Sequence, residues 1–358
     1  MRPRKPRPPR LGAAAAVLLA LAVSCLPLPI RAGEQVITET GSTLMLPLLQ
    51  EWAAAYAKVA PNLRLAPSGS DSGTGIASVI KGTVLLGASD AYMSDPEVAK
   101  NPGILNIPLA ISAQTINYNL PGLARRLRLS GPVLAGIYRG RTTDWSDPAI
   151  AALNPGLALP HHTIVPIRRA DASGDTFIFT QFLTFSDQGW ENGPGYGTTI
   201  AWPAVLGAQT ATGNDGMVKR LAETPYGVAY IGGSYAAAIA QARLGTAELL
   251  NAAGRFVLPT EATVTAAAAE LTPRTPADER LTLAFAPGAD AYPLINYEYA
   301  IVRRAQSSAE DAAALRDFLV WAITPGQGSD AAFLNPVHFI PLPVSIRALS
   351  LSQIAQIH

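Results

Sequence analysis

Short apolar runs that end in small polar residues alternate along this chain with segments of helical periodicity. Leu63–Ala66 is typical of the apolar runs, whereas Leu46, Leu49, Trp52 and Tyr56 recur at the spacing of one helix face. Strands that alternate with helices favour an α/β architecture. The chain has 358 residues, which is enough for two domains with a sizeable core in each.

The expected elements extend this alternation from residue 35 towards the C-terminus. We expect further strands at 35–39, 83–87, 111–120, 163–167 and 294–302. We expect helices at 46–60, 75–81, 131–137, 148–153, 177–183, 233–243, 262–270 and 311–321. The segments 111–120 and 294–302 are the longest strands, and each is long enough to cross from one lobe to another.

The first 32 residues are expected to be an export signal that is removed before the protein acts. Five basic residues precede an apolar run at 11–23, and Ile30-Arg31-Ala32 fits a signal-peptidase site. The run is too short for a comfortable membrane span. We therefore expect a periplasmic or extracytoplasmic protein. A lipid anchor at Cys25 is the less favoured alternative, because 21–25 loosely matches a lipoprotein box.

Charge and metal-ligand spacing exclude two classes of partner. Residues 1–32 hold six of the 27 basic residues and none of the 26 acidic ones, so the remaining chain has a net charge of −5. No basic footprint for nucleic acid remains, and we expect a monomer. The histidines show no metal-ligand spacing, so we expect neither a metal site nor a cofactor. They are His161, His162, His338 and His358.

Three loops share one design, in which a strand ends, glycine and small polar residues follow, and a helix begins. They are 41–44, 70–75 and 171–176. The first turn of a helix leaves backbone N–H groups without partners and carries a partial positive charge. Glycine lets an anion approach these groups, and hydroxyls add donors. Any one of these loops is explained by ordinary helix capping, but three of them together favour an anion-binding site.

Two charged side chains near these loops sharpen the prediction. Arg168 and Arg169 follow the strand at 163–167, and a guanidinium suits a tetrahedral oxyanion. Asp90 follows the strand at 83–87, where it is either another helix cap or a ligand group. A carboxylate only accepts hydrogen bonds, so it favours an anion that still carries a proton. Phosphate carries one near neutral pH and sulfate does not, so Asp90 would exclude sulfate.

Several longer segments resemble one family from about residue 36 to the C-terminus. These segments are Ile37–Pro47, Ser72–Ile76, Gly82–Ala91, Asp144–Ile150, Asn154–Gly156, Arg168–Phe177 and Tyr292–Ile295. In order and spacing they resemble the PstS-type periplasmic phosphate-binding proteins. The resemblance implies a type II periplasmic-binding-protein fold, in which two α/β lobes are joined by two crossing strands and phosphate lies in the interlobe cleft. Lobe I would comprise 33–113 plus 293–358, and lobe II would comprise 114–292.

The resemblance also implies a function and a set of contacts. A protein of this kind captures inorganic phosphate, delivers it to the membrane permease of an ABC-type phosphate importer, and is not an enzyme. The implied phosphate contacts are Thr43, Leu44, Ser72, Asp90, Arg169, Ser173, Gly174 and Asp175, with Asp171 bracing Arg169. Asp175 departs from the threonine of many members and is similar to the Ser-Gly-Asp-Thr variant of the actinobacterial branch. A second carboxylate there would favour a ligand with two protons to give.

Three alternatives remain open. A secreted phosphatase or serine hydrolase is disfavoured because the chain has no Gly-x-Ser-x-Gly motif and no histidine near the candidate serines. A receptor for another oxyanion, such as sulfate or molybdate, is disfavoured by Asp90. An adhesion or structural protein on the same fold is the third alternative, because a fold does not determine a function.

Overall fold

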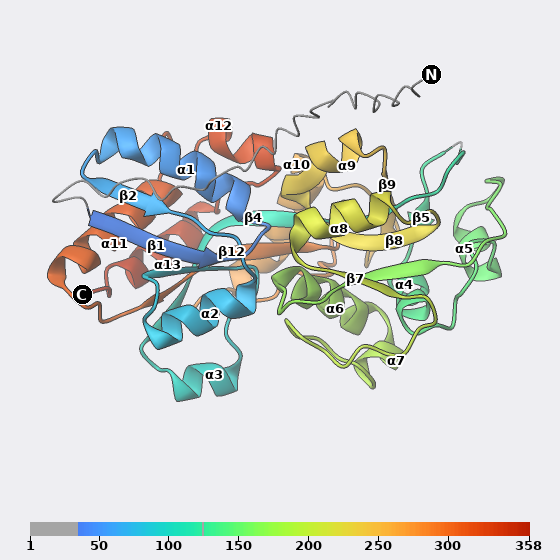
Figure 1. Ribbon diagram of the computed structural model, residues 1–358, viewed down its shortest axis with the longest axis horizontal. Helices are drawn as coiled ribbons and strands as arrows, with labels where there is room; N and C mark the ends of the chain where they lie inside the picture. Colours follow the sequence, from blue (N-terminus) through green and yellow to red (C-terminus); the bar gives the residue numbers. More distant parts are fainter. Residues whose placement is uncertain (1–34, 124) are drawn as a thin grey trace, which may run out of the picture. The chain divides into compact units, whose positions relative to one another are not determined.

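The computed structural model describes residues 35–123 and 125–358 (Figure 1). The expected signal sequence at residues 1–32 and the alternative lipid anchor at Cys25 lie outside the described residues. Contacts group residues 35–358 into one compact unit. Within the described ranges, none of the helices combines the length and the apolar character that crossing a membrane requires.

One large mixed sheet organises this unit. Its nine strands among the described residues follow the order β2-β1-β3-β12-β4-β8-β6-β7, and β9 pairs with β4. They are β1 (Gln35–Gly41), β2 (Leu63–Ala66), β3 (Leu86–Ser89), β4 (Ile104–Tyr118), β6 (Val165–Arg169), β7 (Gln209–Ala211), β8 (Gly227–Gly232), β9 (Gly245–Thr246) and β12 (Ile295–Arg303). The strands β1, β2 and β3 are parallel to one another, and so are β6, β7 and β8. We call these two sets the first half and the second half of the sheet.

Two long antiparallel strands connect the halves. β4 pairs with β12 along Ile104–Ala113 and then with β8 along Gln114–Tyr118, so it belongs to both halves. β12 also pairs with β3 of the first half. The two long strands expected from the sequence are therefore present as β4 and β12, and the predicted α/β class is confirmed. The lobe boundaries given above stay a prediction.

Helices pack on the sheet and a small second sheet lies apart from it. The helices are α1 (Leu46–Val59), α2 (Ser72–Lys81), α3 (Asp95–Lys100), α4 (Gly131–Tyr138), α5 (Pro148–Leu153), α6 (Gly174–Ser186), α7 (Gln188–Glu191), α8 (Gly213–Ala222), α9 (Ala236–Gln241), α10 (Glu261–Leu271), α11 (Ala309–Ile323), α12 (Ala331–Leu334) and α13 (Val344–Ile354). The second sheet has the order β11-β10-β5, with β5 (Arg128–Leu129), β10 (Glu248–Leu250) and β11 (Phe256–Val257). In Figure 1 the helices α6 and α8 lie on opposite sides of the second half of the sheet.

Some element boundaries differ from the expected ones because of capping. α2 begins at Ser72 and not at Gly75, since the Asp71 side chain accepts from the Thr74 N–H at 2.7 Å. α6 begins at Gly174, before the expected residue 177, since Ser173 caps it. β6 extends through Arg169 and so contains both arginines. The expected helix at 233–243 starts as a 3-10 turn before α9.

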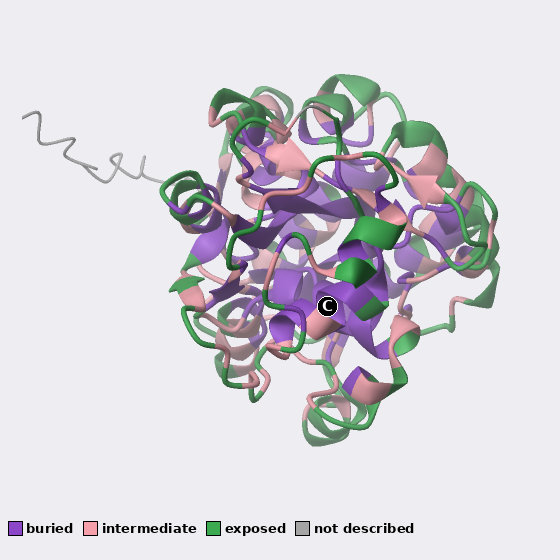
Figure 2. Cartoon of the chain, turned by 90° about the vertical axis from the view of Figure 1, so that its right-hand side faces the viewer, coloured by how far each residue is buried: buried purple, intermediate pink, exposed green. Residues whose placement is uncertain are grey.

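Each of the two halves has its own group of packed aromatic residues. In the first half, Trp52 of α1 packs edge-on against Phe318 and Trp321 of α11, with ring centroids 6.2 and 6.3 Å apart. In the second half, Phe179 of α6 stacks on Tyr230 of β8 at 4.6 Å. Figure 2 shows the buried residues gathered in the central strands and the exposed ones on the outer helices and loops. Both aromatic groups belong to one continuous buried core, which holds the strand ends that form the site described next.

Candidate functional site

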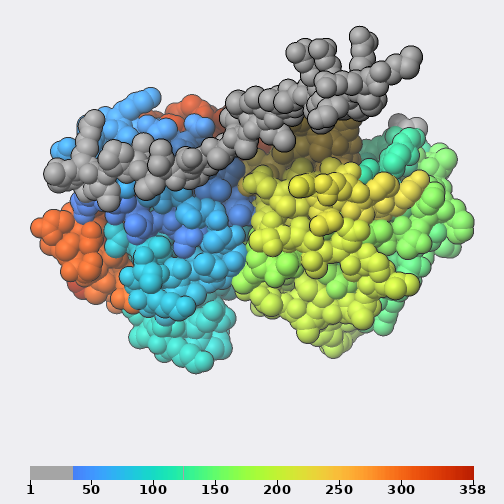
Figure 3. Space-filling model, in the orientation of Figure 1, coloured from blue at the N-terminus to red at the C-terminus, as the bar shows by residue number. Residues whose placement is uncertain are grey.

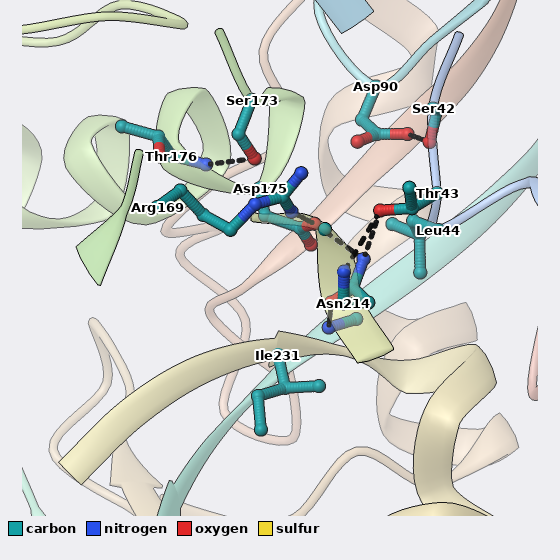
Figure 4. Close-up of polar contacts among 12 residues, drawn as sticks. Ser42, Thr43, Leu44, Asp90, Arg169, Ser173, Asp175, Thr176, Asn214 and Ile231 are labelled. Atoms are coloured by element: carbon teal, nitrogen blue, oxygen red, sulfur yellow. Dashed lines mark hydrogen bonds and ion pairs between the residues drawn. The ribbon is translucent and has the colours of Figure 1, made fainter. Parts of the chain in front are cut away.

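The predicted loops meet where the parallel strands of both halves end (Figure 4). The loops after β1 and β3 come from the first half, and those after β6 and β7 come from the second. Gly41 allows the first two to meet, because a Cβ on Gly41 would overlap the backbone carbonyl of Ala88. On the face shown in Figure 3 the first half, blue to cyan, contacts the yellow-green second half. The Gly73 N–H donates to the Ala172 carbonyl across this contact at 2.9 Å.

The first-half wall of the site is built around Asp90, which is only 1% exposed. The Ser42 hydroxyl donates to one Asp90 oxygen, and the Ser72 hydroxyl donates to the other at 3.3 Å. Ser72 also accepts from the Asp90 N–H at 3.1 Å, which fixes the start of α2 against the end of β3. Asn296 of β12 donates to the Asp90 carbonyl. Asp90 is thus a buried side chain held by neutral donors, and it does not cap a helix.

The second-half wall is built around Arg169, whose side chain is 1% exposed. Its Nε donates to Asp171 at 2.8 Å and its Nη2 donates to the other oxygen of the same carboxylate. Its Nη1 donates to Asp175 at 2.7 Å. Asp171 therefore braces Arg169, as expected, while Asp175 is a second partner of the guanidinium. Since Arg169 has five N–H donors and three are engaged, two remain for an anion.

Neutral side chains connect the two walls. Asn214, at the start of α8, donates through Nδ2 to the Thr43 hydroxyl oxygen at 3.0 Å and to Asp175 at 2.7 Å. Its backbone N–H also donates to Thr43, at 3.2 Å. Gln114 of β4 donates to Asp175 at 3.0 Å. These bonds link the loop after β1 to the start of α6 through one amide side chain.

Several donors of the site have no acceptor among the described residues. The Thr43 hydroxyl accepts twice from Asn214, so its own hydrogen is unused. The Ser173 hydroxyl accepts from the Thr176 N–H at 3.3 Å and donates to no described residue. The N–H groups of Leu44 and Gly174 also lack an acceptor among the described residues. Such donors next to a partly engaged guanidinium form a cradle for an oxyanion.

Burial and charge set the protonation of the two carboxylates in this cradle. Burial, together with the charge of Asp175, raises the pKa of Asp90 to about 6, although hydrogen bonds from Glu298 and Ser42 oppose the rise. Burial also raises the pKa of Asp175, and the Arg169 charge is the main opposing effect. The site thus has one guanidinium among three carboxyl groups, Asp90, Asp171 and Asp175. This charge balance favours an anion that brings protons with it.

The structure brings the predicted residues together at one place. Thr43, Leu44, Ser72, Asp90, Arg169, Ser173, Gly174 and Asp175 all lie at the meeting point of the two halves, with Asp171 behind Arg169. Gly174 lies directly against Ser72 and Asp90, because a Cβ on it would overlap both side chains. Asp71 caps α2 instead of facing the site. That each of these residues contacts a ligand stays a prediction.

Sequence reasoning missed five polar residues that complete the site: Ser42, Gln114, Asn214, Asn296 and Glu298. Ser42 stood inside the first loop but was not distinguished from its neighbours. Asn296 and Glu298 interrupt a strand that is otherwise apolar or aromatic up to Arg303, and this interruption is a signal that could have found them. Gln114 lies among other polar residues of β4, such as Ser112 and Thr115, so it had no such signal. Asn214 had no distinguishing signal in the sequence.

Comparisons with known proteins agree on one superfamily. A family model described as a PBP superfamily domain matches residues 30–325. The chain is 32% identical over 345 residues to the phosphate-binding protein PstS of Methanocaldococcus jannaschii, with 90% of this chain and 86% of the relative aligned. It is also 32% identical over 332 residues to the phosphate-binding protein PstS of Pasteurella multocida, with 92% of both aligned.

Solved structures of the same fold extend the likeness to phosphate complexes. A high-affinity periplasmic phosphate-binding protein, solved with phosphate bound, matches with a TM-score of 0.69 at 23% identity, covering 88% of this chain and 92% of that one. A substrate-binding protein of a phosphate ABC transporter from Clostridium perfringens, solved with bound phosphate, matches with a TM-score of 0.62 at 15% identity. That match covers 86% of this chain and all of the other. At these identities the two structures support the two-lobed fold.

Proposed function

Because the chain belongs to the PBP superfamily and, within it, to the PstS family of phosphate-binding proteins, we propose that it captures inorganic phosphate for an ABC-type importer. The observation that carries this proposal is the cradle at the strand ends. It combines unused hydroxyl and N–H donors, one guanidinium with two free N–H groups, and a buried acceptor, Asp90. This set matches an anion that offers both oxygens and a proton.

Asp90 makes the site selective for phosphate over sulfate. When ionised it can only accept hydrogen bonds, and a proton-free dianion has nothing to donate to it. Such an anion would leave two buried negative charges in contact, and the repulsion would exclude it. The same argument applies to molybdate, so Asp90 disfavours both of the other oxyanions that were considered above.

The affinity follows from the number of charge-assisted hydrogen bonds. Each such bond contributes about 1.5–3 kcal/mol, and a micromolar complex needs about 8 kcal/mol. The donors of Thr43, Leu44, Ser173, Gly174 and Arg169 are enough to reach this range after the anion's desolvation is offset. The contacts between the halves around Gly73 and Ala172 support lobe closure over the anion as the capture step.

The proposed transport role also implies a cellular location and a partner protein. The relatives are named phosphate-binding proteins, and the basic and apolar N-terminal segment is the expected export signal. We therefore place this protein outside the cytoplasm, as a monomer that docks in its closed form on a membrane permease. We propose no chemistry on phosphate, since the Ser42 and Ser72 hydroxyls are hydrogen-bonded to Asp90 and no histidine among the described residues bonds to either.

Calorimetric titration of the phosphate-stripped protein, starting at residue 33, tests the proposal. Phosphate and then sulfate are added near neutral pH and again near pH 5. One-to-one phosphate binding without a sulfate signal at neutral pH is the expected result. Binding of both anions at neutral pH would mean that Asp90 does not face the ligand. Binding of neither would refute the phosphate function and leave the family fold with another use.

A further inference from the structure

Glu298 is a buried acid that the proposed contacts leave unexplained. It lies in the middle of β12, is 0% exposed, and interrupts a strand that is otherwise almost wholly apolar or aromatic. The antiparallel register pairs Tyr299 with Ser89, which places Glu298 next to the end of β3, where Asp90 follows. An acid buried without purpose at this position would destabilise the fold.

The contacts of Glu298 leave it one way to satisfy its carboxyl group. Its Oε1 accepts from the Ser112 hydroxyl of β4 at 2.5 Å. Its Oε2 accepts from no donor among the described residues. The strand register places Asp90 beside Glu298, and a hydrogen bond between the two carboxyl groups would satisfy this oxygen. Two ionised carboxylates cannot form a hydrogen bond, so one of the pair must carry a proton.

The surroundings of Glu298 and Asp90 determine which of the two carboxyl groups carries the proton. Burial, reinforced by the negative charge of Asp90, raises the pKa of Glu298 well above its usual range. Asp90, in contrast, receives hydroxyl donors from Ser42 and Ser72, and Arg169 lies near enough to favour its charge. The proton therefore resides on Glu298, and Asp90 is the acceptor.

We propose that Glu298 is a positioning residue that stays neutral, donates a hydrogen bond to Asp90 and thereby keeps Asp90 an acceptor for a protonated anion. This inference rests on the proposed phosphate function and names the group that sets its selectivity. The other titratable groups that face Asp90 are Asp175 of α6, Arg169 of β6 and Tyr235 of the 3-10 turn Gly233–Tyr235. Asp175 disfavours charge on Asp90 and Arg169 favours it. Without the Glu298 donor, Asp90 would take up a proton at higher pH and could then donate to sulfate.

The first test compares Glu298→Gln with Glu298→Leu by titration with phosphate and sulfate between about pH 5 and pH 8. The glutamine amide can still donate to Asp90 and accept from Ser112. We expect it to keep the phosphate-to-sulfate affinity ratio and its pH profile. Leucine removes the donor, so the ratio at neutral pH should fall about 10-fold and the onset of sulfate binding should move to higher pH. Glu279→Gln, another buried acid that bonds to Ser350 and Gln353 far along the chain, should leave the ratio unchanged.

The outcomes separate this inference from the function on which it rests. Wild-type protein that binds no phosphate would refute the function itself. Wild-type binding together with an unchanged ratio in folded Glu298→Leu would overturn the role of Glu298. If the leucine variant does not fold, the pH profile of the glutamine variant tests the role of Glu298. A shifted pH profile in Glu298→Gln would mean that the native group is ionised, and infrared difference spectra of the two proteins near neutral pH would then lack the band of a protonated carboxyl.

Discussion

Asp90 and Asp175 lie on opposite walls of the same site, are both 1% exposed, and have opposite kinds of partner. Asp175 accepts hydrogen bonds from Arg169, Asn214 and Gln114, all within 3.0 Å. Among the described residues no cation lies within hydrogen-bonding distance of Asp90, which is held by the hydroxyls of Ser42 and Ser72 and has Glu298 beside it on β12. Because the residue type and the burial are the same, the two carboxylates differ only in their hydrogen-bond partners.

This difference assigns different tasks to the two carboxylates. Burial raises the pKa of both, but at Asp175 the main opposing influence is the full charge of Arg169, whereas at Asp90 the charge of Asp175 adds to the rise. The second-half wall is an ion network whose carboxylates are already satisfied by the protein. The first-half wall keeps a carboxylate without a cationic partner, and we propose that it accepts a hydrogen bond from the ligand. Four predictions test this contrast.

The largest effect is expected from removing the only cation of the second-half wall. Arg169→Met leaves Asp171 and Asp175 buried without their partner, and breaking a buried pair in this way costs about 3–5 kcal/mol of stability. Denaturant unfolding of the ligand-free variant measures this loss, and calorimetry should show no phosphate binding. Adding Asp171→Asn and Asp175→Asn to the variant should restore most of the stability but not the binding.

The neighbouring arginine is the matched control for that prediction. Arg168 lies on the same strand, but its guanidinium stacks over the Trp202 ring at 5.1 Å, and its Nε and Nη2 have no partner among the described residues. Arg168→Met should therefore change the free energy of unfolding by about 1 kcal/mol at most. If Arg169→Met costs no more than Arg168→Met, the second-half wall is not held together by charge.

The second prediction compares the same substitution on both walls. Asp90→Asn loses one charge-assisted bond to phosphate, worth about 1.5–3 kcal/mol, so phosphate affinity should fall about 10- to 100-fold. Its amide can donate, so sulfate should begin to bind. Asp175→Asn keeps an acceptor for Arg169, and its phosphate-to-sulfate ratio should stay within about threefold of the native one. Titration of both variants with both anions measures this, and equal loss of selectivity in the two would remove the contrast.

Much of this site was predictable because local rules and a family pattern agreed. The three strand–loop–helix junctions predicted Thr43, Ser72 and Ser173 at or shortly before the start of a helix, and the structure has them there, since capping residues and glycines mark where a helix begins. Their contact with phosphate stays a prediction. Asp90 and Arg169 were identified as candidate site residues because a charged residue directly after an apolar strand indicates a specific role. Apolar periodicity predicted part of the order of strands and helices, but whole elements were missed, among them β8, α8 and α13.

The partners of these residues were not predictable, because they come from distant parts of the chain. Asn214 reaches Thr43 across 171 residues, and Glu298 lies 208 positions from Asp90, so no local pattern links them. The sequence also predicted only part of the role of Asp175. The sequence showed a second carboxylate near the site, but its bond to Arg169 depends on how the first turn of α6 meets the end of β6.

The third prediction tests how closely the two walls approach. A Cβ on Gly174 would overlap the side chains of Ser72 and Asp90, so Gly174→Ala should hold the walls apart and lower phosphate affinity about 10-fold. Because the walls must shift to relieve this overlap, the free energy of unfolding without ligand should also fall, by about 1–3 kcal/mol. Calorimetry and denaturant unfolding on one preparation separate the two effects. Unchanged affinity would show that the walls do not close on the ligand.

The smallest effect is the pH dependence that Asp90 adds to stability. Its pKa is raised from 3.8 to about 6 in the folded protein, so the folded state holds a proton that the unfolded state releases at lower pH. Stability from this group is therefore present at low pH and is lost as the pH rises through about 6, by about 1 kcal/mol between pH 5 and pH 7. In ligand-free unfolding measurements Asp90→Asn should remove that part of the slope. Asp144→Asn is the control: burial opposes the charge of Asp144, but hydrogen bonds from Ser146 and the neighbouring His161 together lower its pKa, so this group stays ionised across the range. A slope that survives in Asp90→Asn would place the proton on another acid of the first-half wall, and the contrast with Asp175 would then rest on geometry alone.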